Sequence, residues 1–198
     1  EESVLDWVAK AADIFRTSAL PGSGVKLYVN FIETTFKSFS IPYDWWSKNF
    51  SASERHTWAV LDVHWYTAWS PECKGEVVPG GAYTCDQPIG EIRKLLRGCA
   101  EKYARKFAAN VQGLKACSEF SCGTYEDAIL ACNDESVLEM FLDVQLEVFG
   151  SHNIEPFFWT WRMPYGETFQ RGWSLKMLTH MEDWPAPHPC SPSFTEIM

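Results

Sequence analysis

The chain has 198 residues, and its 17 Lys and Arg against 26 Asp and Glu give a formal net charge of −9. This acidity argues against a general nucleic-acid surface, because phosphate binding needs clustered cationic side chains. Apolar residues make up 46% of the chain, which excludes wholesale disorder, yet no apolar run reaches the ~20 residues of a membrane-spanning helix.

Hydrophobic periodicity predicts helices that alternate with strands. In chain order, the pattern predicts a helix at 3–17, a strand at 25–32, a short helix around 43–50, a strand at 58–66, a helix at 88–110, a strand at 113–118, a helix at 136–149, a strand at 156–162 and a helix near 168–182. Alternation with near-continuous apolar strands indicates a parallel sheet with helices on its faces. We therefore expect an α/β fold in one domain that spans residues 1–198.

Four strand–helix units are half of a (β/α)8 barrel, which usually takes ~250 residues. The first predicted helix has no strand before it. An open half-barrel would leave unpaired edges on the strands 25–32 and 156–162, which are apolar and carry no Pro or charge interruption within the strand. It would also expose an apolar inner face to water. The sequence therefore predicts pairing with a missing amino-terminal half, in the same or a separate chain.

The seven cysteines contain no CxxC pair, so a structural metal site is not expected. Cys73 and Cys85 bracket a Gly/Pro-rich loop, and Cys122 and Cys132 bracket another short loop. Such local pairs are typical of disulfides in an exported protein, and the alternative is seven free thiols in a cytosolic one. The tripeptide Asn-Phe-Ser that begins at Asn49 is an N-glycosylation acceptor pattern, which agrees with a secreted, extracellular or cell-wall location.

Aromatic residues are unusually frequent, with 13 Phe, 10 Trp and 7 Tyr, or 15% of the chain. Trp is too large to be used freely in a core. This content indicates flat apolar surfaces for a ligand, and sugar rings are one such ligand.

Three short motifs lie at predicted strand ends: Ser-Glu-Phe-Ser at 118–121, His-Trp-Tyr at 64–66 and Phe-Trp-Thr-Trp-Arg at 158–162. Together they resemble glycoside hydrolase family 5. Residues 118–121 resemble its nucleophile motif Gly-Glu-Trp/Phe-Ser at the end of strand seven. Residues 64–66, His-Trp-Tyr, resemble its His-x-Tyr at the end of strand six. Residues 158–162, Phe-Trp-Thr-Trp-Arg, resemble its Phe-Trp-Ser-Trp-Lys at strand eight. In this order the motifs are similar to the fungal-type exo-β-1,3-glucanases of that family.

The resemblance implies that this chain is the second half of a (β/α)8 TIM-type barrel, from helix four to helix eight. It implies an O-glycosyl hydrolase that cleaves β-glucan, expected to be β-1,3-linked, with retention and with neither cofactor nor metal. The family's acid/base glutamate lies in an Asn-Glu-Pro motif, which is absent from this sequence and is expected upstream of Glu1.

Carried over by motif, Glu119 is the expected nucleophile, and Tyr66 would donate a hydrogen bond that keeps its carboxylate ionised. His64 lies two residues before Tyr66, hence on the same side of the strand, and would bind a sugar hydroxyl. Without the resemblance, the simpler interpretation is a solvated loop glutamate and a pair of core aromatics with satisfied polar tips.

Four tryptophans are candidate substrate-binding residues. Trp159 matches the family's tryptophan that forms the floor of the sugar subsite beside the nucleophile. In the family, the peptide bond after this tryptophan is often cis. Trp161 would line the same wall or belong to the core. Trp65 and Trp69, after strand six, would extend the cleft, with helix and loop packing as the alternative.

A bridge from helix six to the tail, also implied by the resemblance, would join Cys99 to Cys190 and leave Cys117 unpaired. Two other interpretations remain open. One is a non-catalytic barrel relative that binds glycans or builds an extracellular assembly. The other is an unrelated α/β protein in which the three motifs are coincidental.

Overall fold

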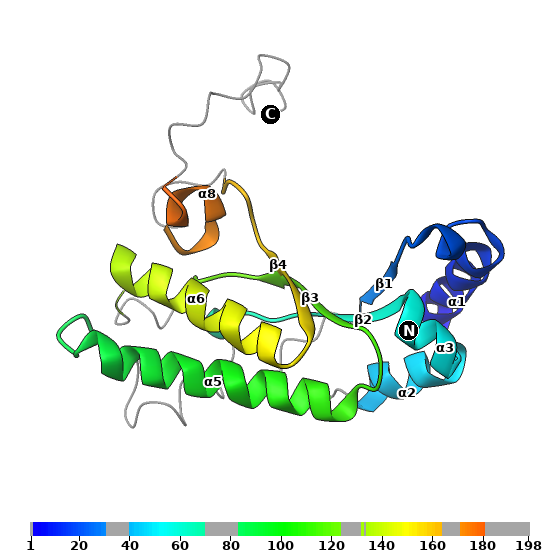
Figure 1. Cartoon of the computed structure of the whole chain (residues 1–198), viewed down its shortest axis with the longest axis horizontal. Helices are drawn as coiled ribbons and strands as arrows, with labels where there is room; N and C mark the ends of the chain where they lie inside the picture. The colour runs from blue at the N-terminus through cyan, green and yellow to red at the C-terminus, as the bar shows by residue number, and fades with distance from the viewer. Residues whose placement is uncertain are drawn as a thin grey trace, which may run out of the picture.

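A four-stranded parallel sheet forms the centre of the molecule (Figure 1). The computed structural model describes residues 2–30, 40–69, 83–123, 132, 134–163 and 171–180. The strands follow the order β1-β2-β3-β4 and are β1 (Leu27–Asn30), β2 (Ala59–His64), β3 (Lys115–Phe120) and β4 (Ile154–Phe158). The predicted α/β fold with a parallel sheet is confirmed.

Helices lie before, between and after the strands. They are α1 (Glu2–Thr17), α2 (Ser40–Asn49), α3 (Ala52–Thr57), α5 (Ile89–Asn110), α6 (Glu135–Ser151) and α8 (Leu175–Leu178), with 3-10 turns η1 (Pro21–Ser23) and η2 (Thr67–Trp69). The periodicity did not predict α3, but a capping box marks its start: Ser51 and Glu54 each accept the other's backbone N–H. Within the described ranges, none of the helices has the length and apolar character needed to cross a membrane.

The prediction of one long helix near 168–182 is wrong within the described residues. Ser174 has an extended backbone and separates the helical residues 171–173 from the short helix α8. The backbone N–H groups of Leu175 and Lys176 donate to the carbonyl oxygens of Thr160 and Trp161. These bonds tie the start of α8 to the segment that follows β4.

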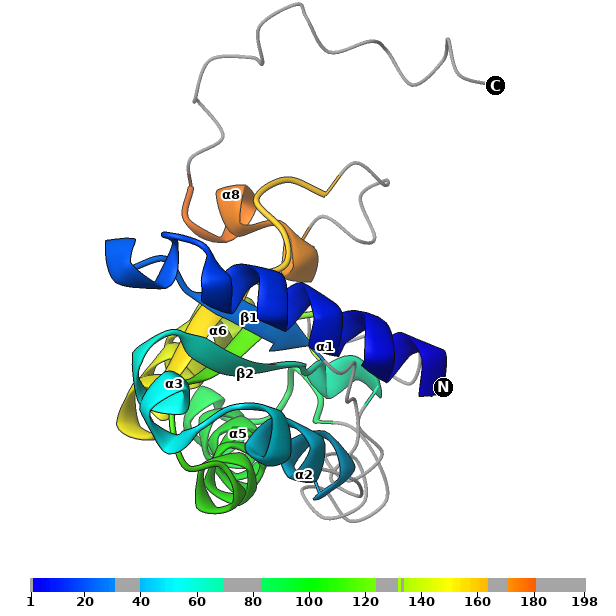
Figure 2. The ribbon, with the colours of Figure 1, turned by 90° about the vertical axis from the view of Figure 1, so that its right-hand side faces the viewer.

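The main core lies between the sheet and the helices on one of its faces. Figure 1 shows α5 and α6 packed side by side along that face, and Figure 2 shows α1 lying across β1. The apolar stripe of α5 explains its orientation, because residues three or four apart share one side of a helix. Its buried members are Ile92, Leu96, Cys99, Ala100, Tyr103, Ala104 and Phe107.

The opposite face of the sheet is concave. In a flat sheet, three steps of about 4.8 Å would separate the outermost strands β1 and β4. The Tyr28 hydroxyl on β1 nevertheless donates to Oε2 of Glu155 on β4 at 2.7 Å, and Lys26 Nζ reaches the same oxygen at 3.1 Å. The rings of Tyr28 and Phe157 also meet edge to face, with centroids 5.6 Å apart. The sheet therefore curves until side chains of its two outer strands touch.

The concave face carries polar side chains, so the expected apolar inner face is wrong. Asn30 and Ser118 both hydrogen-bond Asp62 on this face. Val60, two residues before Asp62, lies on the same face. It is fully buried, but it does not belong to the core cluster that packs against the helices. The near-continuous apolar appearance of the strands conceals this polar alternation.

The edge of β4 also differs from the prediction. Glu155 and Pro156 lie inside β4, so this outer strand does contain both a charge and a proline. The Trp159 N–H donates to the Phe120 carbonyl on β3, and alternation then places the Pro156 nitrogen on the side away from β3. Proline therefore removes no donor from the ladder, as expected for an edge strand.

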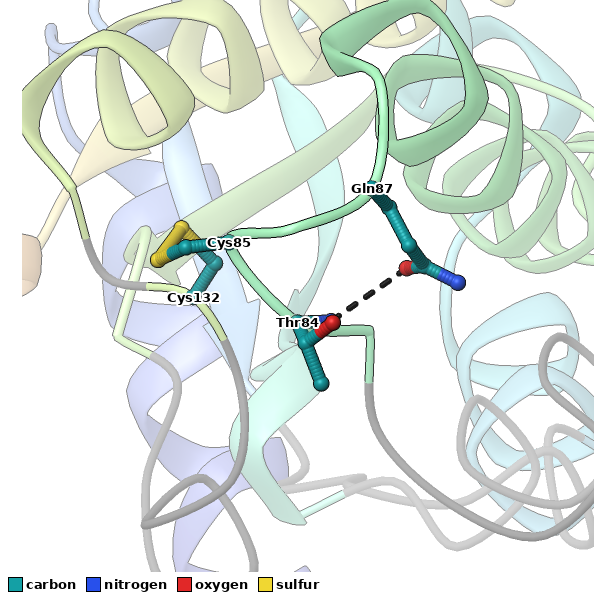
Figure 3. The surroundings of a disulfide bond; sticks show 4 residues. All are labelled: Thr84, Cys85, Gln87 and Cys132. Atoms are coloured by element: carbon teal, nitrogen blue, oxygen red, sulfur yellow. Dashed lines mark hydrogen bonds between the residues drawn. A yellow bond between two sulfur atoms is a disulfide. The ribbon is translucent and has the colours of Figure 1, made fainter.

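A disulfide joins Cys85 to Cys132, 47 residues apart in the sequence (Figure 3). The two cysteines precede α5 and α6, and the packing of these helices brings their starts together. The predicted local pairs Cys73–Cys85 and Cys122–Cys132 are therefore wrong. Cys122 instead keeps a buried free thiol, 3.6 Å from Gln145 Nε2.

The remaining cysteines divide into two groups. Cys117 is free and buried on β3, as predicted. Burial raises the pKa of both the Cys117 and Cys122 thiols well above the ordinary value, so neither is a reactive thiolate. Cys99 is disulfide-bonded, and its predicted partner Cys190 lies outside the described residues, as does Cys73.

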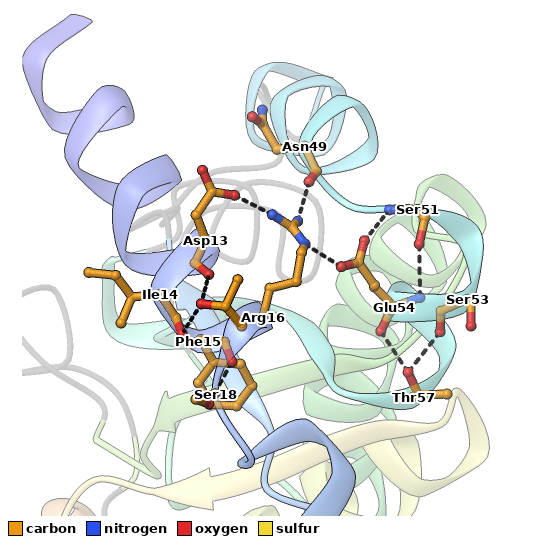
Figure 4. Close-up of polar contacts among 11 residues, drawn as sticks. Asp13, Ile14, Phe15, Arg16, Ser18, Asn49, Ser51, Ser53, Glu54 and Thr57 are labelled. Atoms are coloured by element: carbon orange, nitrogen blue, oxygen red, sulfur yellow. Dashed lines mark hydrogen bonds and ion pairs between the residues drawn. The ribbon is translucent and has the colours of Figure 1, made fainter.

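Arg16, near the end of α1, connects that helix to the junction of α2 and α3 (Figure 4). Its guanidinium donates to Glu54 Oε1 at 2.5 Å, to the Asn49 carbonyl at 2.9 Å, and to the Asp13 carboxylate. Burial alone would raise the pKa of Glu54, but hydrogen bonds from Arg16 and Ser51 outweigh it and hold that pKa below its ordinary value.

Candidate functional site

A β-bulge in β3 sets the geometry of the site. The adjacent residues Val63 and His64 of β2 pair with Cys117 and Glu119, which leaves Ser118 as the extra residue. The pairing of β3 with β4 shifts in the same stretch. Bulges re-aim side chains and are frequent next to active sites. Here the bulge brings Glu119 opposite His64 at the carboxyl end of the sheet.

Glu119 is held through one of its two carboxylate oxygens. The Tyr66 hydroxyl donates to Oε2 at 2.7 Å, and His64 Nδ1 lies 3.2 Å from the same atom. Among the described residues, no hydrogen bond or ion pair falls on Oε1, and 27% of the Glu119 side chain is exposed. The structure thus brings all three predicted polar residues together and leaves one carboxylate oxygen open.

Tyr66 remains a hydrogen-bond donor at any physiological pH. Burial, followed by the hydrogen bond to Glu119, raises the pKa of Tyr66 far above the ordinary value for a phenol. Its proton stays available to hold Glu119 Oε2 and to fix the orientation of the carboxylate. The local arrangement therefore suits a carboxylate that acts as a nucleophile.

Asp62 hydrogen-bonds the bulged residue Ser118 and was not among the predicted site residues. It is 2% exposed, and its carboxylate accepts from the Ser118 backbone N–H at 2.8 Å, from Ser118 Oγ at 2.5 Å and from Asn30 Nδ2 at 2.9 Å. Asp62 therefore binds the bulged residue through both backbone and side chain. Its position two residues before His64, on the same face, is the sequence signal that could have identified it.

Trp159 and Trp161 follow β4 and are 46% and 47% exposed. The Trp159 N–H donates to the Phe120 carbonyl at 2.8 Å, which places Trp159 beside the end of β3. The peptide between Trp159 and Thr160 is cis, as the resemblance implies. Both indoles thus offer open apolar surface after β4, and Trp159 lies near the end of the strand that carries Glu119.

Trp65 is wrongly predicted as a substrate-binding residue. It is fully buried, and its ring stacks on Tyr103 of α5 with centroids 4.5 Å apart. Alternation explains this, because His64 and Tyr66 face the site and the residue between them faces the helices. The backbone of Trp69 ends η2, but its side chain is not among the described ones.

Asn49, the predicted glycosylation acceptor, is the last residue of α2. Its Nδ2 donates to the Trp45 carbonyl at 2.8 Å, and Ser51, the third residue of the acceptor pattern, caps α3. The pattern therefore lies in an ordered helix–helix junction. Its glycosylation stays a prediction.

Two groups of potential metal ligands occur in the described part of the chain, and neither includes Glu119. In the first, Cys85 and Cys132 are already joined in the disulfide. In the second, His180 approaches Glu139 through Nε2 at 2.6 Å and Glu135 through Nδ1 at 3.5 Å. Each imidazole nitrogen thus lies beside a different carboxylate, and the three side chains contact one another directly.

No protein-family model matches the chain, and no curated protein matches it. Among solved structures, the chain is similar to one described as "Crystal structure of AoRut", with 17% sequence identity and a TM-score of 0.50. The similarity covers 89% of this chain and 41% of the other, so this chain spans about two fifths of that structure's length. At this identity, the likeness supports the α/β fold alone.

Proposed function

We propose that the protein is a retaining glycoside hydrolase that cleaves β-glucan, with Glu119 as its nucleophile. The observation that carries this proposal is the geometry of Glu119, held through Oε2 by Tyr66 and His64 while Oε1 stays open. Exposed indole surface on Trp159 lies beyond the neighbouring strand end. The three motifs that resemble family 5 supply all four of these residues.

The proposed reaction has two steps. In the first, Glu119 Oε1 attacks the anomeric carbon and forms an ester bond, while the glycosidic bond breaks and its electron pair goes to the leaving oxygen. That oxygen takes a proton from the acid/base glutamate, which we place upstream of Glu1. In the second step, water gives a proton back to this glutamate and attacks the same carbon. Glu119 leaves as a free carboxylate, and two inversions give retention.

The substrate we propose is a β-linked glucan, probed first as a β-1,3-glucan. The CH groups of a glucose ring stack on the flat face of an indole, and Trp159 and Trp161 have such faces half exposed. His64 lies beside the nucleophile, where its imidazole can contact a sugar hydroxyl.

We further propose that the sheet is half of a (β/α)8 barrel closed by an amino-terminal half. The curvature that joins Tyr28 to Glu155 is what a barrel wall requires. On α1, Trp7 and Ile14 lie seven residues apart and are 69% and 72% exposed, whereas Ala12 is buried toward β1. We place the missing half along the free edges of β1 and β4 and against this outer stripe of α1.

A secreted or cell-wall location is also proposed. The Cys85–Cys132 bond supports it, because disulfides persist mainly in oxidising compartments.

The direct test is hydrolysis of a β-1,3-glucan by the complete protein and by its Glu119→Gln variant. Turnover should fall by at least roughly a thousandfold, because an amide cannot form the covalent intermediate. Glucan binding should persist, since shape and stacking are unchanged. Glu91→Gln, an exposed change on α5, is the matched control and should keep wild-type turnover. Undiminished hydrolysis by Glu119→Gln would remove Glu119 from the mechanism.

The second candidate is a non-catalytic glycan-binding relative. The half-exposed side chains of Trp159 and Trp161 support it as well, because stacking on a sugar ring needs no catalytic carboxylate. In that case the complete wild-type protein would bind the glucan without cleaving it, and Trp159→Ala would abolish binding.

A further inference from the structure

The ring of Tyr66 is backed by a residue outside all three motifs. Trp173 stacks on it, with ring centroids 5.1 Å apart and planes inclined by 30°. Tyr66, Ala68, Met163 and Trp173 form a small buried cluster separate from the main core. Trp173 is 6% exposed, so its indole is enclosed and does not offer a free face to a ligand.

The backbone around Trp173 joins the ends of two strands. Its carbonyl accepts the Thr160 N–H at 2.9 Å, directly after the exposed Trp159. One residue earlier, the Gly172 carbonyl accepts the Cys122 N–H at 2.8 Å, just beyond the end of β3. The segment therefore fixes both the chain that leaves the nucleophile strand and the chain that carries Trp159.

Two glycines make room for this arrangement. A Cβ built on Gly123 would lie 2.0 Å from Trp173 Nε1, and one built on Gly172 would lie 2.8 Å from the Cys122 carbonyl oxygen. Real Cβ contacts are essentially never this short, so any larger residue at Gly123 has to displace the indole. The position of Trp173 thus depends on the backbone immediately after the Ser-Glu-Phe-Ser motif.

We propose that Trp173 is a positioning residue of the hydrolytic site, which acts through Tyr66. By packing against the phenol ring, it restricts the ring to the orientation in which the hydroxyl donates to Glu119 Oε2. A small displacement of a positioning contact is enough to lower the rate of a reaction strongly. This inference rests on the proposed hydrolytic function.

The test is a double-mutant cycle with Trp173→Ala and Tyr66→Phe in the complete protein, with kcat and KM measured on a β-1,3-glucan. Trp173→Ala should lower kcat by roughly tenfold to a hundredfold. In the Tyr66→Phe background it should cause little further loss, because the hydroxyl it positions is gone. Trp58→Ala, which empties an equally buried site in the main core, should leave kcat unchanged. If the kcat of the double variant falls by the product of the two single losses, the proposal is overturned.

Two further variants cover the case in which Trp173→Ala does not fold. Trp173→Phe keeps a stacking ring and should retain most of the activity. Gly123→Ala should reproduce the loss of kcat with Trp173 intact, because the added methyl displaces the indole. Wild-type kcat in folded Gly123→Ala protein would contradict the proposal.

A readout without substrate separates this inference from the proposed function. In an ultraviolet titration of tyrosine ionisation, Trp173→Ala should show one more tyrosine ionising near the ordinary phenol pKa, because Tyr66 loses burial. The added signal should be missing when Tyr66→Phe is combined with it. If the wild type does not hydrolyse glucan but Trp173→Ala shows the extra ionising tyrosine, the proposed hydrolase function is rejected and the positioning of Tyr66 is kept. If folded Trp173→Ala shows the same tyrosine titration as the wild type, the positioning role is rejected.

Discussion

The hydroxyl oxygen of Tyr66 and Oε2 of Glu119 lie 2.7 Å apart, although 53 residues separate them in the chain. Parallel pairing of β2 with β3 aligns the carboxyl ends of the two strands. The bulge at Ser118 then turns Glu119 toward β2, and Asp62 fixes the bulge. The result is a carboxylate with one oxygen occupied and the other open to a substrate.

Loss of the Tyr66 hydroxyl should impair catalysis more than binding. In the complete protein, Tyr66→Phe keeps the ring stacked on Trp173 but removes the donor to Glu119. We expect kcat to fall by about tenfold to a thousandfold, with a smaller change in KM, because a preorganised donor is lost. Steady-state kinetics on a β-1,3-glucan will measure both constants. An unchanged kcat would show that this hydrogen bond has no part in turnover.

The outer stripe of α1 should prove to be buried in the complete protein. If an amino-terminal half covers Trp7, Trp7→Ala should lower the free energy of unfolding by about 3 kcal/mol or more. Lys10→Ala, an exposed change on the same helix, serves as the control and should stay within about 0.5 kcal/mol of the wild type. Denaturant titration measures both. If Trp7→Ala changes the free energy of unfolding as little as the control does, nothing covers the stripe in the complete protein.

The disulfide between the starts of α5 and α6 should contribute substantially to stability. In the chain-entropy account, a bond that closes 47 residues contributes up to about 4 kcal/mol. Cys132→Ser should therefore lower the free energy of unfolding by about 2–4 kcal/mol. The wild type should lose at least as much in reductant, because reductant also opens the disulfide of Cys99. Peptide mapping that instead found Cys85 joined to Cys73 would contradict this connectivity.

The contact between Arg16 and Glu54 should make stability depend on pH. The folded-state pKa of Glu54 lies below its ordinary 4.5, so the stabilisation is present above that pH and is lost as the pH falls through the folded-state pKa. Glu54→Gln should cost about 1 kcal/mol at neutral pH, since the pair is partly exposed. The free energies of unfolding of the two proteins, measured by urea titration, should become equal in acid. A difference that persists with the carboxyl protonated would assign the effect to packing.

The sequence was informative where a local pattern decides the structure. Apolar periodicity located the strands, and the spacing of His64 and Tyr66 correctly placed both on one face. The same alternation should have turned Trp65 toward the helices, where it stacks on Tyr103. It also shows in the first strand, where Tyr28 and Asn30 alternate with apolar residues.

Other features depend on contacts that no local pattern encodes. Cys85 and Cys132 meet only because two helices pack side by side, so bracketing of loops was a misleading guide to the pairing. Trp173 lies 107 residues after Tyr66, in a part of the sequence that has no motif of its own, and still stacks on it.

The central claim is that Glu119 becomes covalently bound to sugar during turnover. The complete protein should be incubated with an activated 2-deoxy-2-fluoro-β-glucoside, whose fluorine slows the hydrolysis of a glycosyl–enzyme ester. Mass spectrometry of the intact chain and its peptides then locates the label. We predict one 2-fluoroglucosyl group per chain, on the peptide that contains Glu119, and none in Glu119→Gln. Active protein that hydrolyses glucan with no label on Glu119, or with the label on another carboxylate, would contradict the claim.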